Sequence, residues 1–288
     1  MRAIRRLWGT SGKFQLGVVL LGILIALAVL HPFLNWLIGG NQDPIGLSAY
    51  DRWEVPNAYH WLGTDRYGRD ILAMSLSGLA ISLEIAVIAG FLSTFIGVIV
   101  AFVAGYKGGW IDAVLRTTTD MFLVIPTFPL LLTLSAYVRN VSLLTVALML
   151  SVFSWPFAAR PIRSYVLSLR SRPYVELARV TNLNDFQIIF QELVPNLLPY
   201  LGVGFANAAL GAVFALVGLE VIGLGPANII DLGILIQYAI SWGAMSLGAW
   251  PIFVAPVVFL SFVFISVNLI NIGLEEVYNP RLRGTAGA

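Results

Sequence analysis

The sequence predicts an all-α, polytopic membrane protein. Of its 288 residues, 58% are hydrophobic and only 11% are charged. Soluble globular proteins contain fewer hydrophobic and more charged residues. Several apolar runs have roughly the twenty residues that a helix needs to cross a bilayer. Two polar segments, residues 38–77 and 171–195, interrupt these runs. We therefore expect six transmembrane helices with one long loop and one polar insert.

The first predicted transmembrane helix covers residues 14–37 and follows a basic segment, residues 1–13. Its apolar run is too long for the core of a signal peptide and has no clear small-residue cleavage site, so we expect a retained anchor. Gly12 and Lys13 do not indicate a phosphate loop, because Phe14 stands where that motif needs Ser or Thr. We expect no nucleotide site in this chain.

Residues 38–77 are predicted to form a polar loop. It contains the runs Leu62-Gly63-Thr64-Asp65 and Gly68-Arg69-Asp70, preceded by His60. One histidine with two scattered carboxylates is far more typical of hydrogen bonds and ion pairs than of a metal site. We therefore predict no metal site there.

The core of the transmembrane region is predicted over residues 78–274. Its apolar segments lie at about 79–105, 110–138, 143–167, 197–222 and 249–274. Prolines inside or near these segments predict kinked rather than broken helices, since neighbouring helices satisfy the freed carbonyls; they are Pro126, Pro129, Pro156 and Pro161. The glycine-rich residues 223–248 predict an external loop with a partial helix.

The polar insert is predicted to be a helical hairpin. One helical face carries the i, i+3, i+4, i+7 series, which consists of Tyr174, Leu177, Ala178 and Thr181. Asn182 follows at the turn, where a residue that tolerates positive φ is needed. Asn184 and Gln187 have the spacing of a capping box that begins the second helix, and Pro195 lies near its end. A hairpin of this kind also suits a position against lipid headgroups.

Four stretches resemble the membrane subunits of ABC importers. Glu176-Leu177-Ala178, Asn182 and Val194-Pro195 fall on the Glu-Ala-Ala, Gly and Leu-Pro positions of the loop that docks on the ATPase. The run around residues 60–70, the turn at 105–112 and the tail at 273–283 resemble the C-type permeases of the dipeptide, oligopeptide and nickel family, which includes oligosaccharide carriers. The departures, such as Leu177 for Ala and Asn182 for Gly, keep each position apolar or tolerant of positive φ.

This resemblance implies a type I importer fold with a cytoplasmic coupling helix between spans 4 and 5. It implies a non-catalytic subunit that binds no cofactor, with ATP and Mg held by two partner ATPases. A homologous second permease and an external solute-binding protein would complete the transporter, whose expected substrates are short peptides or oligosaccharides. The implied ATPase-docking residues are Tyr174, Glu176, Leu177, Ala178, Thr181, Asn182 and Pro195.

Three carboxylates lie in predicted spans, where ionisable residues are functional candidates. They are Glu84, Asp120 and Glu220. Asp120 follows Arg116 by four residues, a spacing that favours a local ion pair, whereas Glu84 and Glu220 are expected near external ends. We favour structural or pathway-lining roles for all three. The alternative is an autonomous ion-coupled secondary transporter that uses them as coupling sites.

The distribution of charge predicts the orientation. Thirteen of the 17 Lys and Arg residues fall on one side of the six-span arrangement, which places both termini and the docking loop in the cytoplasm of a prokaryotic plasma (inner) membrane. The tail, residues 275–288, is then cytoplasmic, and a seventh span would reverse it. The absence of cysteine excludes disulfides and thiolate sites.

This orientation can be tested by cysteine labelling, because no native cysteine interferes. Single cysteines at Ser48 and Asn228 are expected to react with an impermeant maleimide added outside intact cells. Cysteines at Ser11, Asn184 and Thr285 are expected to react only after the membrane is permeabilised. Labelling of positions 184 and 228 from the same side would contradict six spans.

Overall fold

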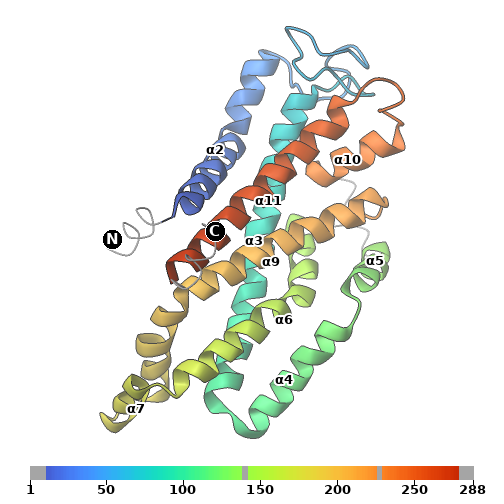
Figure 1. Ribbon diagram of the computed structural model, residues 1–288. Coiled ribbons are helices and arrows are strands. Elements are labelled where there is room, and N and C mark those ends of the chain that lie inside the picture. The colour runs from blue at the N-terminus through green and yellow to red at the C-terminus, as the bar shows by residue number, and fades with distance from the viewer. Residues whose placement is uncertain (1–10, 138–141, 226–228, 279–288) are drawn as a thin grey trace, which may run out of the picture. The chain divides into compact units, whose positions relative to one another are not determined.

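The computed structural model describes residues 11–137, 142–225 and 229–278, so Asn228, Thr285 and most of the terminal segments lie outside it. The regular structure of the described residues is helical, and a single β-bridge joins Thr64 and Asp70 (Figure 1). Five helices are long and apolar enough to cross a membrane: α2 (Gly12–Gly39), α3 (Ile71–Lys107), α6 (Leu143–Arg170), the helix through α9 (Val194–Val221) and α11 (Pro251–Tyr278). A sixth results if α4 (Gly109–Val124) and α5 (Thr127–Tyr137) form one span.

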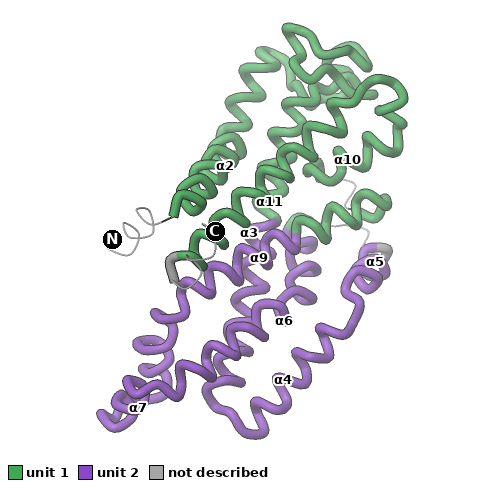
Figure 2. The backbone as a smooth tube through the Cα atoms, viewed as in Figure 1, with its two compact units in different colours: residues 1–85, 138–143, 213–288 green, residues 86–137, 144–212 purple. Residues whose placement is uncertain are grey.

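The chain divides into two compact units, each of which we describe by itself (Figure 2). Unit 1 comprises residues 1–85, 138–143 and 213–288, and unit 2 comprises residues 86–137 and 144–212. Helices α3 and α9 contribute one part to each unit.

In unit 1, α2 packs along α11 through glycines (Figure 1). A Cβ atom on Gly17 would lie 2.7 Å from the carbonyl oxygen of Ser266, and one on Gly273 would lie 2.6 Å from Cβ of Phe14. Small residues of this kind let membrane helices approach at backbone distance. Near the start of α2, Lys13 Nζ lies 2.6 Å from Oε1 of Glu276, an ion pair between the two helices.

Polar side chains of the loop between α2 and α3 in unit 1 hold its fold. Asp65 accepts hydrogen bonds from the backbone N–H groups of Tyr67 and Arg69 and pairs with the Arg69 guanidinium at 2.6 Å. Asp70 caps α3 through the N–H of Ala73 and lies 2.8 Å from Nδ1 of His60. The predicted hydrogen bonds and ion pair are thus present, and they explain why this motif contains these residue types.

Two glycines of the same loop are required by its backbone. Gly63 and Gly68 have φ angles of 76° and 70°. A Cβ atom would lie 2.2 Å from the carbonyl oxygen of Glu54 at the first position and 2.1 Å from that of Tyr50 at the second. Both the left-handed conformation and the close approach exclude a side chain.

In unit 2, α3 presents a line of glycines to α6 and α9. A Cβ atom on Gly90 would lie 2.9 Å from Cβ of Ala209, and one on Gly97 would lie 2.9 Å from both Cβ of Ala158 and the carbonyl oxygen of Trp155. Farther along α3, a Cβ atom on Gly105 would lie 2.8 Å from Cγ1 of Val166. These contacts set the spacing of the three helices.

The prolines act differently from one helix to another. Pro156 and Pro161 lie inside the continuous helix α6, as predicted. The prediction of kinks without breaks is wrong at Pro126: α4 ends at Val124, Ile125 is extended, and α5 continues at an angle of 75°. A proline disfavours the helical conformation of the residue before it, so Ile125 leaves the helix. The partial helix expected in residues 223–248 is present as α10 (Leu232–Ser241).

The glycine contacts of α3 predict a large difference between two substitutions. Gly97→Leu is expected to destabilise the chain by about 1–3 kcal/mol, because the new side chain meets the backbone of α6. Gly211→Leu in α9 is the control, since nothing lies within 4 Å of its Cβ position. Tryptophan fluorescence during thermal unfolding of the purified chain measures the difference. Equal midpoints for the two variants would contradict this account of the packing.

Candidate functional site

The polar insert forms the predicted helix, turn and helix. Helix α7 (Pro173–Val180) begins with proline in its first turn and ends before Asn182, whose φ angle is 65°. The side chain of Asn184 accepts the N–H of Gln187 at 2.8 Å, and the Gln187 side chain accepts the N–H of Asn184 at 3.0 Å. This capping box starts α8 (Asp185–Gln187), which continues through the π-helix η1 (Ile188–Leu193) into α9.

The hairpin has a buried face that differs from the predicted one. Val175 and Ala178 are buried, and Ala178 is only 6% exposed. They belong to a hydrophobic cluster with residues of α3, α6, η1 and α9, including Phe102, Ile162 and Leu193. The series Tyr174, Leu177, Ala178 and Thr181, which the spacing places on one face, therefore does not form one exposed face, because Ala178 contacts the chain's own core.

The exposed apolar side chains of the hairpin come from both of its arms. Leu177 is 64% exposed and Val180 is 82% exposed in α7. In the second arm, Phe186 and Phe190 are exposed and lie against each other with ring centroids 4.4 Å apart. We call these four residues the apolar surface of the hairpin. Phe186, Phe190 and Leu193 have the spacing of one α-helical face, but the π-helix adds residues to the turn and Leu193 is buried.

Polar contacts fasten the hairpin to the end of α3. The hydroxyl of Tyr106 donates a hydrogen bond of 2.8 Å to Asp185, and the guanidinium of Arg179 lies 5.7 Å from the centroid of the Tyr106 ring. Arg170, at the end of α6, donates to the carbonyl oxygens of Gly105 and Tyr106. Helix α3 thereby gains donors for carbonyls that its own last turn leaves free.

The remaining predicted docking residues lie at the edge of the hairpin. Glu176 is exposed and forms no ion pair with Arg172 or Arg179 in the described part of the chain. Thr181 ends α7, and its hydroxyl donates to the carbonyl oxygens of Leu177 and Ala178. Pro195 is exposed in the first turn of α9. Tyr174 is half-buried beside the hydrophobic cluster.

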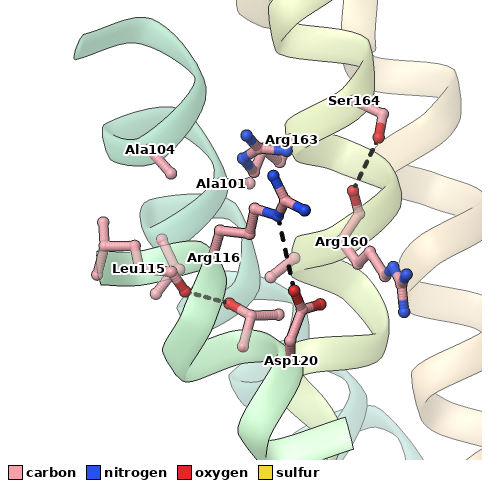
Figure 3. A pocket seen from close by; sticks show the side chains of 11 residues that line it. Ala101, Ala104, Leu115, Arg116, Asp120, Arg160, Arg163 and Ser164 are labelled. Atoms are coloured by element: carbon pink, nitrogen blue, oxygen red, sulfur yellow. Dashed lines mark hydrogen bonds and ion pairs between the residues drawn. The ribbon is translucent and has the colours of Figure 1, made fainter. Parts of the chain in front are cut away.

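A polar pocket of about 240 Å³ lies between α3, α4 and α6 in unit 2 (Figure 3). Asp120 lines it, and its carboxylate lies 3.6 Å from Nε of Arg116, so the ion pair expected from their spacing is present. Both side chains are about half exposed, and such a pair contributes little to stability. Arg163 of α6 binds Asp112 of α4 through two nitrogen atoms. Sequence reasoning missed this second pair, because 51 residues separate its members.

The other two candidate carboxylates differ in their surroundings. Glu84 is exposed on α3, and Glu220 is fully buried in the last turn of α9. Of the three, only Asp120 lines the described pocket.

Comparison with known proteins identifies the family. Residues 93–284 match the model of the binding-protein-dependent transport system inner membrane component. The chain belongs to this family. An oligopeptide transport system permease protein, OppC, of Mycobacterium bovis is 32% identical over 72% of this chain and 71% of its own length. A dipeptide transport system permease protein, DppC, of Bacillus subtilis is 32% identical over 80% of this chain and 67% of its own length.

The fold of this permease also has a counterpart among solved structures. A structure of the MetNI methionine ABC transporter in an inward-facing conformation matches with a TM-score of 0.56. The match covers 71% of this chain and 97% of the other at 19% identity, so it concerns the fold alone. The all-α, polytopic fold class predicted from the sequence is confirmed.

The positive φ angle of Asn182 in the turn can be tested by substitution. Asn182→Gly is expected to be tolerated, whereas Asn182→Val is expected to cost about 1–2 kcal/mol, because a β-branched residue resists the φ angle of 65°. Hydrogen exchange of the amides of residues 173–187 measures this loss locally. Asn182→Gly is the reference variant, since glycine adopts a φ angle of 65° without strain. Equal protection in the glycine and valine variants would show that the turn imposes no conformational constraint.

Proposed function

We propose that this chain is the permease subunit of a binding-protein-dependent ABC importer for short peptides or oligosaccharides. Its family membership carries the proposal. The names of the similar permeases, oligopeptide and dipeptide transport proteins, favour peptides as the substrate class. The subunit itself would catalyse no reaction.

The proposed assembly contains four kinds of partner. A second, homologous permease would complete the translocation pathway, and two ATPases would bind ATP and Mg on the cytoplasmic side. An external solute-binding protein would deliver the substrate, and membrane lipid would cover the outer helices. The chain would lie in the inner membrane with both termini cytoplasmic, an orientation supported by the distribution of Lys and Arg.

The apolar surface of the hairpin is the proposed contact with an ATPase. This surface, Leu177, Val180, Phe186 and Phe190, is exposed at the end of unit 2. Three arginines, at positions 170, 172 and 179, lie in the same part of the sequence, and an excess of arginine is typical of cytoplasmic loops. A short amphipathic helix that presents such side chains suits a groove on a partner protein. The buried face of α7 is already occupied by the chain's own core, so only the opposite face is available for docking.

The contacts of the hairpin support a transmission mechanism. Val175 and Ala178 pack into a cluster shared with α3, α6 and α9. Close-packed interiors move as units instead of deforming continuously. When the ATPases close on ATP, the displaced hairpin would carry the connected segments of these helices with it, and the pathway would alternate between inward-open and outward-open states. The free energy would come from the partners.

The alternative, an autonomous ion-coupled transporter, has weaker support. A coupling site needs a carboxylate that exchanges its ion with the pathway. Asp120 is engaged by Arg116, and Glu220 is enclosed by the chain. Glu84 is the remaining candidate, since it is exposed on α3.

Charge placed on the apolar surface tests the docking proposal. Val180→Asp is expected to abolish co-purification of the ATPases with the permease, because a buried, unpaired carboxylate costs several kcal/mol at an interface. Membrane insertion and the thermal midpoint of the chain are expected to stay unchanged, since Val180 is 82% exposed. Ala178→Asp would be less informative, because it disrupts the chain's own core.

Val55→Asp is the matched control for this experiment. Val55 is 73% exposed in the external loop, where it cannot reach a cytoplasmic ATPase, so normal co-purification is expected. Normal assembly and ATPase stimulation in Val180→Asp would show that the hairpin is not the docking element. Gradient-driven uptake by the purified chain alone in proteoliposomes would instead favour the secondary transporter.

A further inference from the structure

Two carboxyl groups of unit 1 are buried against each other. Glu220, in the last turn of α9, is 0% exposed, and Asp231, which caps α10, is 1% exposed. Oε2 of Glu220 lies against Gly233, two residues after Asp231 at the start of α10, where a Cβ atom would be only 2.0 Å away. Among the described residues, no hydrogen-bond donor reaches either carboxyl oxygen of Glu220 or the Oδ2 atom of Asp231. The arrangement therefore places two acceptors together with no hydrogen atom between them.

Backbone encloses Glu220 tightly. A Cβ atom on Gly233 would lie 2.0 Å from Oε2 of Glu220, and one on Gly225 would lie 2.1 Å from its Cγ atom. On the other side of the pair, a Cβ atom on Gly78 of α3 would lie 3.0 Å from the backbone of Asp231. The side chain of Glu220 thus fits only because glycines face it, and little room remains for water or an ion.

No cation compensates the pair within the described part of unit 1. The titratable side chains described on the elements around it are Glu84 of α3, Tyr238 of α10, and Glu275 and Glu276 of α11. Residues 213–221 of α9 contain no titratable group besides Glu220. The guanidinium of Arg69 reaches the ring of Tyr238 but is held by Asp65 at 2.6 Å. Two ionised carboxylates in this place would be desolvated and would repel each other.

We propose that Glu220 and Asp231 bind a single structural proton, so that a neutral Glu220 donates a hydrogen bond to an ionised Asp231. The hydrogen-bond donors around each carboxyl group decide which one carries the proton. Asp231 accepts the N–H of Ile234 at 2.9 Å and lies at the N-terminus of a ten-residue helix, which favours its negative charge. Glu220 has no such donor. The proton would join the end of α9 to the start of α10, across the loop that connects them.

A bound cation is the less suitable way to compensate this charge. Ca²⁺ takes six to eight oxygen ligands, and the close approach of Gly233 and Gly225 leaves Glu220 no space to share one. No cluster of three or more acidic, histidine or cysteine ligands occurs among the described residues. A proton needs only one oxygen of each carboxyl group, and both groups are buried at the start of α10 with oxygens that have no donor among the described residues.

A proton shared by the two carboxyl groups makes the stability of the folded chain fall as the pH rises. Folding takes up one proton, so the folded state keeps it at a pH at which the unfolded chain has lost it. The stabilisation is complete below the ordinary pKa of glutamate, about 4.3, and decreases as the pH rises. Above that pH, the unfolding equilibrium constant of the wild type is expected to rise about tenfold per pH unit relative to Glu220→Gln, whose amide donates without titrating.

Two measurements on the full-length chain test this proposal. Infrared spectroscopy at about pH 8 is expected to show the carbonyl band of one neutral carboxylic acid, which shifts in D₂O and is missing from Glu220→Gln. The melting temperature of Glu220→Gln is expected to exceed that of the wild type by a margin that grows between about pH 6 and about pH 9. Glu84→Gln is the control, because Glu84 is exposed: both its band and its pH profile should match the wild type.

Several results would overturn the proposal. A wild-type spectrum with no neutral acid band at about pH 8 would mean that both groups are ionised, and this measurement decides even if Glu220→Gln does not fold. A melting temperature that rises with added NaCl or CaCl₂ in the wild type but not in Glu220→Gln would indicate a cation site instead. A pH-independent difference between the two proteins would likewise exclude the proton. None of these results depends on whether the chain imports peptides.

Discussion

The packing of α7 against the chain's own core is the constraint on which the proposed coupling depends. Val175 and Ala178 belong to a hydrophobic cluster that includes residues of α3, α6 and α9. Tyr106 belongs to the same cluster and also donates a hydrogen bond to Asp185, so apolar and polar contacts reinforce each other at one place. A hairpin held only by its two chain connections would bend when pushed. This one is supported on its whole inner face.

The local features of the hairpin could be predicted because local chemistry determines them. Asn182 at the turn and the capping box of Asn184 follow from residue type and spacing over a few positions. The buried face could not be predicted in the same way, since it depends on which side meets α3 and α6. Val175 lay outside the i, i+3, i+4, i+7 series of the first helix, and the π-helix of residues 188–193 departs from the periodicity of an ordinary α-helix. Pro126 predicted a kink, but the sequence did not indicate that α4 would end just before it.

The carboxylates illustrate the same limit. In sequence, Glu84, Asp120 and Glu220 are equivalent members of apolar runs, whereas in the structure one is exposed, one is paired and one is enclosed. The pair of Arg116 and Asp120 was predictable because both lie on one helix, and hydrogen bonds and ion pairs were also expected at His60, Asp65 and Asp70, although Arg69 was not singled out as the partner of Asp65. The bond between Asp112 and Arg163 depends on two helices meeting, which no short pattern encodes.

The pairing of α2 with α11 has a consequence for synthesis. These helices lie near opposite ends of the chain, yet Gly17 and Gly273 bring their backbones into contact and Lys13 binds Glu276. Helix α2 therefore enters the membrane long before its neighbour exists, and its glycine face has only lipid or another protein to contact until α11 arrives. Contacts of such large sequence separation form slowly. Unit 1 can acquire its native packing only after α11 has been synthesised, so a chain interrupted before α11 would leave this face open to chaperones and to membrane proteases.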